Sequence, residues 1–248
     1  MKKLTLLLFL FVLLACSQKN KDQKALLTER QSTAKIVVKH QVKTIAMETV
    51  LEESFLDSTQ IGVKGKSKII VNQYRSDDST CVEITLFEKR KTKWFVQQQL
   101  HYLKDGITNC EPEIKDFNND GLNDLTFKSS VAARGANEIR KLLIFDKASK
   151  KSILIKNSDQ YPNLQYNKTL NCVDAWLVYG GSSTVFLKIE KDSLRKFASV
   201  TLEDSAIEIT VIDKKGNAKI IKKELVEDLE VYTRYDNYAP LTESNSSN

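Results

Sequence analysis

One short stretch of the chain gathers oxygen-bearing side chains at a regular spacing. In KDFNNDGLND, residues 115–124, acid or amide residues fall at positions 1, 3, 5 and 9 of a loop, and a glycine falls at position 6. Alternate oxygen ligands of this kind wrap a hard cation such as Ca²⁺, and the glycine permits the sharp bend between them. The predicted ligands are the side chains of Asp116, Asn118, Asp120 and Asp124 and the backbone carbonyl of Leu122.

The rest of the loop departs from a helix–loop–helix calcium site. Position 12 is Phe127, whose phenyl ring has no oxygen where that site supplies a bidentate glutamate. The flanking ITNCEPEIK and LTFKSSV patterns do not look helical, and the second favours a strand. We therefore expect a calcium loop over 116–127 that joins strands. The alternative is a polar turn whose side chains bond their own backbone, although three carboxylates this close repel one another unless a cation neutralises them.

The sequence lacks the motifs of common hydrolases and nucleotide-dependent enzymes. It has no G-x-S-x-G, H-E-x-x-H, P-loop or G-x-G-x-x-G pattern, and its two histidines, His40 and His101, lie in no recognisable cysteine-hydrolase signature. The acid pairs Glu52–Glu53 and Glu111–Glu113 leave glycoside hydrolysis open as an alternative, because that reaction needs two carboxyl groups. We expect a protein that is not an enzyme.

The chain begins with a pattern typical of exported lipoproteins. Two lysines precede an apolar run from Leu4 to Ala15, which is too short for a permanent transmembrane helix. Leu13-Leu14-Ala15-Cys16 resembles the lipobox of bacterial lipoproteins, whose cysteine is diacylated and becomes the new N-terminus. We predict that residues 1–15 are a cleaved signal peptide and that Cys16 carries the lipid anchor, with an ordinary signal peptide as the alternative. The anchor implies attachment to the bacterial outer membrane, on its periplasmic or cell-surface side.

Two segments follow the predicted signal peptide. Residues 16–34 lack a sustained apolar pattern and are predicted to be a flexible tether. Residues 35–248 are predicted to form a single domain. Removal of residues 1–15 takes away two lysines and lowers the formal charge from +6 to +4. The lysine-rich stretches EKRKTKW and DKASKKS are predicted to be solvated hairpin tips, and no nucleic-acid partner is expected outside the cytoplasm.

Short segments rich in Val, Ile, Thr and aromatic residues recur through this domain. They alternate apolar with polar residues in part and are separated by turn residues, which predicts strands joined in antiparallel hairpins. Helical periodicity is weak, and its best case is near residues 46–55. The predicted fold is all-β, a sandwich or partial-propeller-like domain with few short helices. The strand segments are 67–75, 81–89, 93–103, 125–130, 139–147, 175–181, 183–191, 195–204, 206–214 and 219–225.

Three cysteines follow Cys16, which is an odd number for an oxidising compartment. We expect one disulfide and one remaining thiol. Because Cys110 lies just before the calcium loop and would benefit from being pinned, Cys110–Cys172 is favoured over the alternative, Cys81–Cys110.

The loop and the residues after it resemble known calcium-binding proteins. D-x-N-x-D-G-x-x-D is similar to the short calcium loops of FG-GAP-like repeat proteins, although this chain has one copy and a full propeller repeats it. Arg134-Gly135-Ala136-Asn137 and Phe145-Asp146 follow it, and this order resembles a family of periplasmic proteins that includes immunity lipoproteins against peptidoglycan-cleaving toxins. The resemblance covers about residues 65–200, and outside the calcium loop its motifs are loose. It implies an exported β-rich domain with Ca²⁺ on the five ligands named above.

Three hypotheses for the function follow. The favoured one is a membrane-anchored, non-catalytic binding module with a structural calcium ion. The second is an inhibitor or immunity protein that binds a lysozyme-like cell-wall hydrolase, and the third is a glycan hydrolase.

Overall fold

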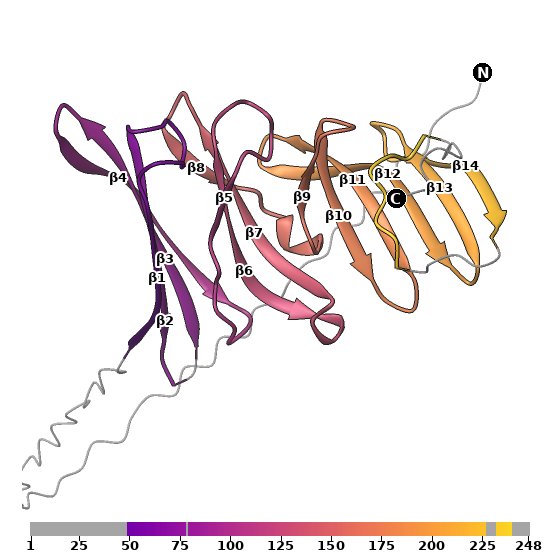
Figure 1. Cartoon of the computed structure of the whole chain (residues 1–248), viewed down its shortest axis with the longest axis horizontal. Coiled ribbons are helices and arrows are strands. Elements are labelled where there is room, and N and C mark those ends of the chain that lie inside the picture. The colour runs from indigo at the N-terminus through magenta and orange to yellow at the C-terminus, as the bar shows by residue number, and fades with distance from the viewer. Residues whose placement is uncertain (1–48, 78, 227–231, 240–248) are drawn as a thin grey trace, which may run out of the picture. The chain divides into compact units, whose positions relative to one another are not determined.

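The computed structural model describes residues 49–77, 79–226 and 232–239 (Figure 1), all within one compact unit over Ala46–Asn248. The predicted signal peptide, the predicted lipidation site Cys16 and the predicted tether 16–34 lie outside these residues. The helices in the described part are single short turns, and none has the length or apolar character to cross a membrane.

The described residues form fourteen strands and two 3₁₀ turns. The strands are β1 (Val50–Asp57), β2 (Ser67–Arg75), β3 (Thr80–Arg90), β4 (Lys93–Lys104), β5 (Glu113–Lys115), β6 (Asp124–Ala132), β7 (Asn137–Asp146), β8 (Lys151–Leu154), β9 (Gln165–Asn167), β10 (Cys172–Val178), β11 (Ser182–Glu190), β12 (Ser193–Glu203), β13 (Ala206–Ile212) and β14 (Ala218–Leu225), and the 3₁₀ turns are η1 (Ala133–Gly135) and η2 (Ser158–Gln160).

The strands make three antiparallel sheets of consecutive hairpins. The first sheet has the order β1-β2-β3-β4, the middle sheet β5-β6-β7-β8, and the third sheet β14-β13-β12-β11-β10-β9. Each strand therefore pairs only with its neighbours in the sequence, and the three sheets follow one another along the chain (Figure 1). The predicted all-β fold of antiparallel hairpins is confirmed.

The middle sheet is buried on both faces. In β7, Leu143 and Phe145 belong to a cluster shared with the first sheet, whereas Leu142 and Ile144 belong to a cluster shared with the third sheet. Because successive side chains of a strand point to opposite faces, a continuous apolar run is what such a strand requires. The first of these clusters contains Ile69, Val71, Val82, Ile84 and Leu86 from β2 and β3, and Leu125, Phe127, Leu143 and Phe145 from β6 and β7.

The other face of the third sheet has its own apolar cluster, which the C-terminal segment 232–239 covers. Phe186 packs against Tyr238 with ring centroids 5.7 Å apart. Arg234 of the same segment pairs with the buried carboxylate of Asp174 on β10, with an Nε–Oδ1 distance of 2.9 Å. A buried carboxylate is costly without such a partner, so this ion pair fixes where the segment lies.

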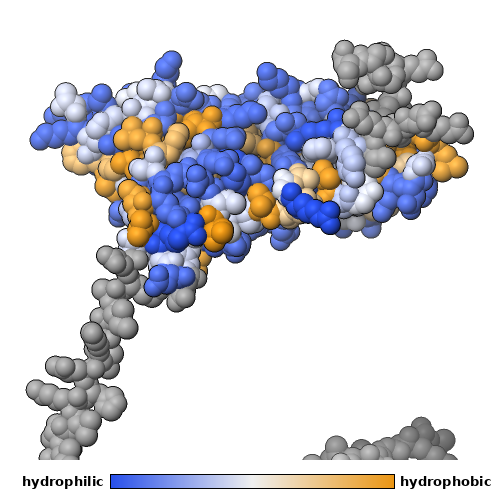
Figure 2. Space-filling view, turned by 60° about the horizontal axis from the view of Figure 1, so that its bottom comes forward, coloured by the Kyte–Doolittle hydropathy of each residue, from blue (hydrophilic) through white to orange (hydrophobic). Residues whose placement is uncertain are grey.

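The best case of helical periodicity, near residues 46–55, is a strand from residue 50 onward. Residues 50–57 form β1, which pairs with β2 along its length, and Phe55 packs against the cluster between the first two sheets. Pairing with the exposed edge of β2 outweighs a weak helical preference, because an isolated short helix is marginal in water. The surface is mainly hydrophilic on the face shown in Figure 2, where apolar residues form separate patches.

Gly62 joins the first sheet to the middle sheet, and we predict that Gly62→Ala destabilises the fold. Its N–H donates to the carbonyl of Asn123 at 2.9 Å, its φ is +53°, and a Cβ atom there would lie 2.6 Å from Cε2 of Phe145. Overpacking the core and straining the backbone should together lower the free energy of unfolding by about 2–3 kcal/mol in urea denaturation.

Gly65→Ala is the matched control, because Gly65 has φ +71° but nothing lies within 4 Å of its added Cβ. Only the backbone strain remains there, so the expected loss is about 1 kcal/mol. Equal losses in the two variants would contradict the close packing of Gly62 on Phe145.

Candidate calcium site

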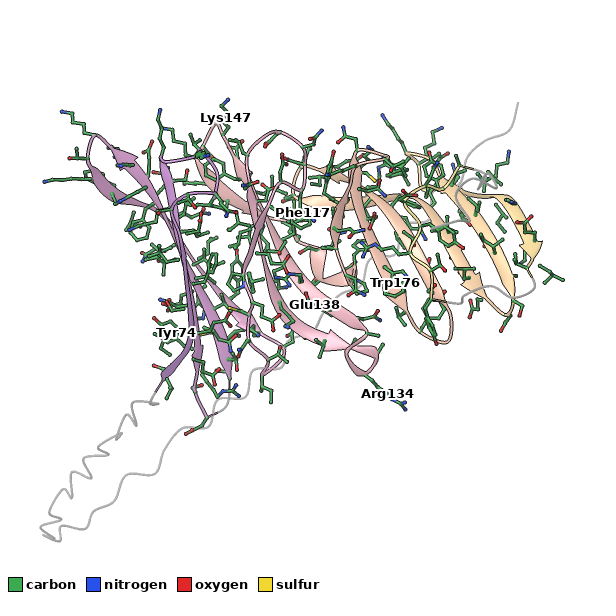
Figure 3. All side chains as sticks on the ribbon, in the orientation of Figure 1. Tyr74, Phe117, Arg134, Glu138, Lys147 and Trp176 are labelled. Carbon is green, nitrogen blue, oxygen red and sulfur yellow. The ribbon has the colours of Figure 1, made fainter. Side chains whose placement is uncertain are left out.

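The predicted calcium loop is the connection of a hairpin. Residues 116–123 join β5 to β6, and Lys115 and Asp124 are paired at its base. Phe117, labelled in Figure 3, is almost fully buried in the cluster between the middle and third sheets. One apolar side chain therefore anchors a loop that is otherwise polar.

Asp116 organises the first half of the loop through its carboxylate. Oδ1 accepts hydrogen bonds from the N–H groups of Asn118 (3.2 Å) and Asn119 (2.6 Å), and Oδ2 accepts one from Gly121 (2.9 Å). Gly121 has φ +81°, a conformation in which glycine carries little strain. The glycine at position 6 thus turns its N–H group back toward the acid at position 1.

Asn118 and Asp120 continue the pattern on the solvent side. The N–H of Asp120 donates to Oδ1 of Asn118 at 3.1 Å, and the N–H of Leu122 donates to Oδ1 of Asp120 at 2.8 Å. The Asn118 amide also donates to Oδ2 of Asp120 at 3.0 Å. These two side chains are therefore neighbours on one exposed side of the loop.

Asp124 lies at the buried end of the loop with no exposed surface. Its Oδ2 accepts the N–H of Phe117 and its Oδ1 accepts the N–H of Phe145, both at 2.8 Å. The pKa of this carboxyl is raised to about 7, chiefly by burial and to a smaller extent by the charges of Asp120 and Asp116, against the opposing effect of those two hydrogen bonds. The three carboxylates are thus close enough to repel one another.

These residues fit an oxygen-liganded cation in donor chemistry and in backbone conformation. Their ligand atoms are carboxylate, amide and carbonyl oxygens, which Ca²⁺ prefers. Oδ1 of Asp116 accepts two hydrogen bonds, but each of the three carboxylates has at least one oxygen that accepts a single hydrogen bond and retains a lone pair. In the described part of the chain no three His, Cys, Asp or Glu side chains are grouped closely enough to hold a metal by themselves. The loop therefore needs the Asn118 amide and the Leu122 carbonyl to complete a ligand set.

The C-terminal half of the loop is fixed to the first sheet. Asn123 forms an isolated bridge with Ile61, and its side-chain amide donates to the carbonyl of Gln60 at 3.1 Å. The partner segment is itself held by Asp57, whose Oδ1 accepts the N–H groups of Gln60 and Ile61, each at 2.8 Å. Two polar turns from different sheets thus support each other.

The two polar residues of the Arg134-Gly135-Ala136-Asn137 element lie in different surroundings. Arg134 is exposed at the tip of the β6–β7 hairpin (Figure 3), with φ +56° between Ala133 (φ +49°) and Gly135 (φ +97°). Asn137 connects two sheets, because its side chain donates to the carbonyl of Val178 at 2.8 Å and accepts the N–H of the same residue at 2.9 Å.

The acid pairs considered for glycoside hydrolysis come together at one place and are neutralised there. Glu53 accepts the N–H groups of Cys110 and Glu111, at 2.6 and 3.0 Å. Hydrogen bonds from Arg75 lower the pKa of Glu52, and those from Lys128 lower the pKa of Glu111. A catalytic acid for this reaction holds its proton at neutral pH through a raised pKa, which is the opposite environment.

Sequence reasoning missed the buried Lys104 in this region. Its Nζ donates to Oε1 of Gln73 at 3.0 Å and to the carbonyl of Thr108, and burial lowers its pKa. A lysine at the end of a strand gives no sequence signal of burial, because only the packing of the first sheet on the segment 105–112 encloses it.

The predicted Cys110–Cys172 disulfide is not present, and the prediction is corrected. Cys81, Cys110 and Cys172 are free thiols. Cys110 packs in the cluster between the first and middle sheets, whereas Cys172 packs in the cluster under the C-terminal segment. The middle and third sheets both lie between these two clusters, so the two thiols cannot meet to form a disulfide.

We predict that native protein has one reactive thiol among these three. Burial raises the pKa of Cys110 to about 12 and that of Cys172 to about 11, and both thiols are shielded from a reagent. Burial also raises the pKa of Cys81, but this thiol is only half-buried, so a reagent can reach it. A chromogenic disulfide reagent should therefore modify Cys81 alone in native buffer and all three thiols in denaturant, without added reductant, in a chain with Cys16→Ser. If the reagent modifies only one thiol in denaturant, the other two are joined in a disulfide and the correction is wrong.

Comparisons with known proteins give little further information. No family model matches the chain, and no curated protein matches it. A solved structure described as a type IV secretion system related protein from Xanthomonas is similar over 70% of this chain and 98% of its own, with 13% identity and a TM-score of 0.45.

Proposed function

We propose that this chain is a membrane-anchored exported lipoprotein that binds Ca²⁺ in the 116–124 loop and acts as a non-catalytic binding module. The ion would be held by Asp116, Asn118, Asp120, the Leu122 carbonyl and Asp124. The observation that carries the proposal is that the loop keeps three carboxylates together around a glycine turn. The pKa of the buried Asp124 is raised by its burial and, to a smaller extent, by its two acidic neighbours.

A bound cation would have a structural effect at this point. It would offset the repulsion between the three carboxylates and tie the half-buried Asn118 and the exposed Asp120 to the buried end of the loop. Because Phe117 packs toward the third sheet and Asn123 bonds the first sheet, the stabilisation would extend to both neighbours of the middle sheet.

The non-catalytic role is supported by the hydrogen bonds and ion pairs of the candidate acids. The two pairs considered for hydrolysis are engaged with backbone N–H groups, lysine and arginine, and the loop acids are engaged with backbone N–H groups. The second candidate, an inhibitor of a cell-wall hydrolase, is favoured by the exposed turn at Ala133–Gly135. Arg134 at its tip is exposed, and exposed loops held by a rigid sheet are where binding residues concentrate.

We predict that Ca²⁺ raises the melting temperature of the unlipidated chain and that Asp116→Ala with Asp120→Ala abolishes the rise. For a Kd of about 0.1 mM, calcium at about 1 mM should stabilise the folded state by about 1.4 kcal/mol. Calorimetric titration should show heat with the parent chain and none with the double variant.

Asp213→Ala is the matched control. Asp213 also caps a polar turn, since its Oδ1 accepts the N–H groups of Lys215 (2.7 Å) and Asn217 (2.9 Å). This variant should lose some stability yet keep the full calcium response. If the parent shows neither heat nor a shift in melting temperature, the loop is a polar turn and the calcium proposal fails.

A further inference from the structure

The two lysine-rich stretches that are far apart in the sequence lie together at one end of the first and middle sheets. The backbone N–H of Lys89 donates to the carbonyl of Lys66 at 2.8 Å, Lys150 pairs with Glu88, and the Gln97 amide donates to the carbonyl of Ser149 at 3.2 Å. The β3–β4 turn, the loop before β2 and the β7–β8 turn are therefore neighbours, and Lys147 marks this end in Figure 3.

We call this surface the basic end. Its cations come from three segments, 64–68, 89–93 and 147–151, and all except the half-buried Lys68 are exposed. The acids within it are Glu88, which pairs with Lys150 and Arg90, and Asp146, which accepts the N–H of Ser149 at 2.7 Å. The basic end consists of Lys64, Lys66, Lys68, Lys89, Arg90, Lys91, Lys93, Lys147, Lys150 and Lys151.

Apolar side chains are interleaved with these charges. Nζ of Lys68 lies 4.1 Å from the ring centroid of Phe87 and 5.3 Å from that of Trp94. On the same hairpin Phe95 is 44% exposed and Val96 is 54% exposed. A pocket of about 270 Å³ between the turns is lined by the apolar Val63, Phe87 and Phe145 and by the cations Lys66, Lys147 and Lys150.

We infer that the basic end docks on the anionic surface of a lipid bilayer. The exposed apolar side chains of Phe95 and Val96 beside many cations match the two layers of such a surface, where charged headgroups lie above an apolar interior. Nearly all the cations are lysines, whose flexible, hydrated charges suit a diffuse negative surface, whereas a site for one phosphate group favours the planar fork of arginine. A soluble polyanion would satisfy the charges but would leave Phe95 and Val96 exposed.

This inference does not depend on the calcium proposal. The acids of the neighbouring loop, Asp116 and Asp120, lie toward the same end, because Gly121 and Leu122 line a pocket together with Val63 and Lys64. Without a bound cation these acids would weaken the attraction to anionic lipid. The experiment is done with a calcium chelator present, so that bound Ca²⁺ cannot contribute to the binding. The proposed anchor at Cys16 would bring a bilayer near, and the experiment removes it as well.

The experiment is co-sedimentation of the chain from residue 16 onward, with Cys16→Ser, with vesicles of phosphatidylcholine alone or mixed with phosphatidylglycerol. We expect binding to the mixed vesicles, little binding to the neutral ones, and weakening as salt is added. A variant with Lys64→Gln, Lys93→Gln and Lys147→Gln removes one exposed, unpaired charge from each segment. At about fivefold per charge, its partition coefficient should fall about a hundredfold.

The matched control carries Lys168→Gln, Lys214→Gln and Lys219→Gln, which removes the same charge from exposed positions of the third-sheet region. It should bind the mixed vesicles as the parent does, and the melting temperatures of both variants should confirm that they fold. Equal weakening in the control, or equal binding of the parent to neutral vesicles, would overturn the inference. Failure to bind mixed vesicles, with retention on a heparin column, would assign the basic end to a soluble polyanion.

Discussion

The two-sided burial of the middle sheet is the constraint on which the rest of the structure depends. In β7 the alternating residues Leu142 to Phe145 contribute to two separate apolar clusters, so one strand holds the first and third sheets at once. A strand buried on both faces tolerates few polar side chains, and the backbone N–H and C=O groups at its ends need hydrogen-bond partners in the loops. Asp124 meets this need by accepting the N–H of Phe145, where the loop joins the core.

Local pairing made most of the fold predictable. Every strand bonds only to strands adjacent in the sequence, so alternating apolar residues and turn chemistry were enough to place ten strand segments and the antiparallel hairpins. Of the other four strands, β5, β8 and β9 are too short to show a periodicity of their own, and β1 was hidden by a weak helical pattern. The stacking of sheets depends on contacts between distant residues, which periodicity alone does not specify.

The same distinction applies to the sites. The spacing of the loop acids is a local property, and the structure keeps those residues in one turn, with Gly121 bonded to Asp116 as the pattern implies. The cysteine pairing was wrong because it required knowledge of which cluster each thiol joins. The burial of Lys104 and the meeting of two lysine-rich turns were missed for the same reason, since both arise only when the sheets pack together.

Charge is distributed by the strand register. Hairpins of consecutive strands place alternate turns at opposite ends of a sheet, so the turns after β3 and β7 and the loop before β6 share one end. That end carries both the acidic loop and the surrounding lysines, whose fields partly cancel. A cation in the loop would remove the acidic contribution and leave the whole end more positive. The calcium loop, if loaded, would therefore change the electrostatic potential of the basic end without any movement of the sheets.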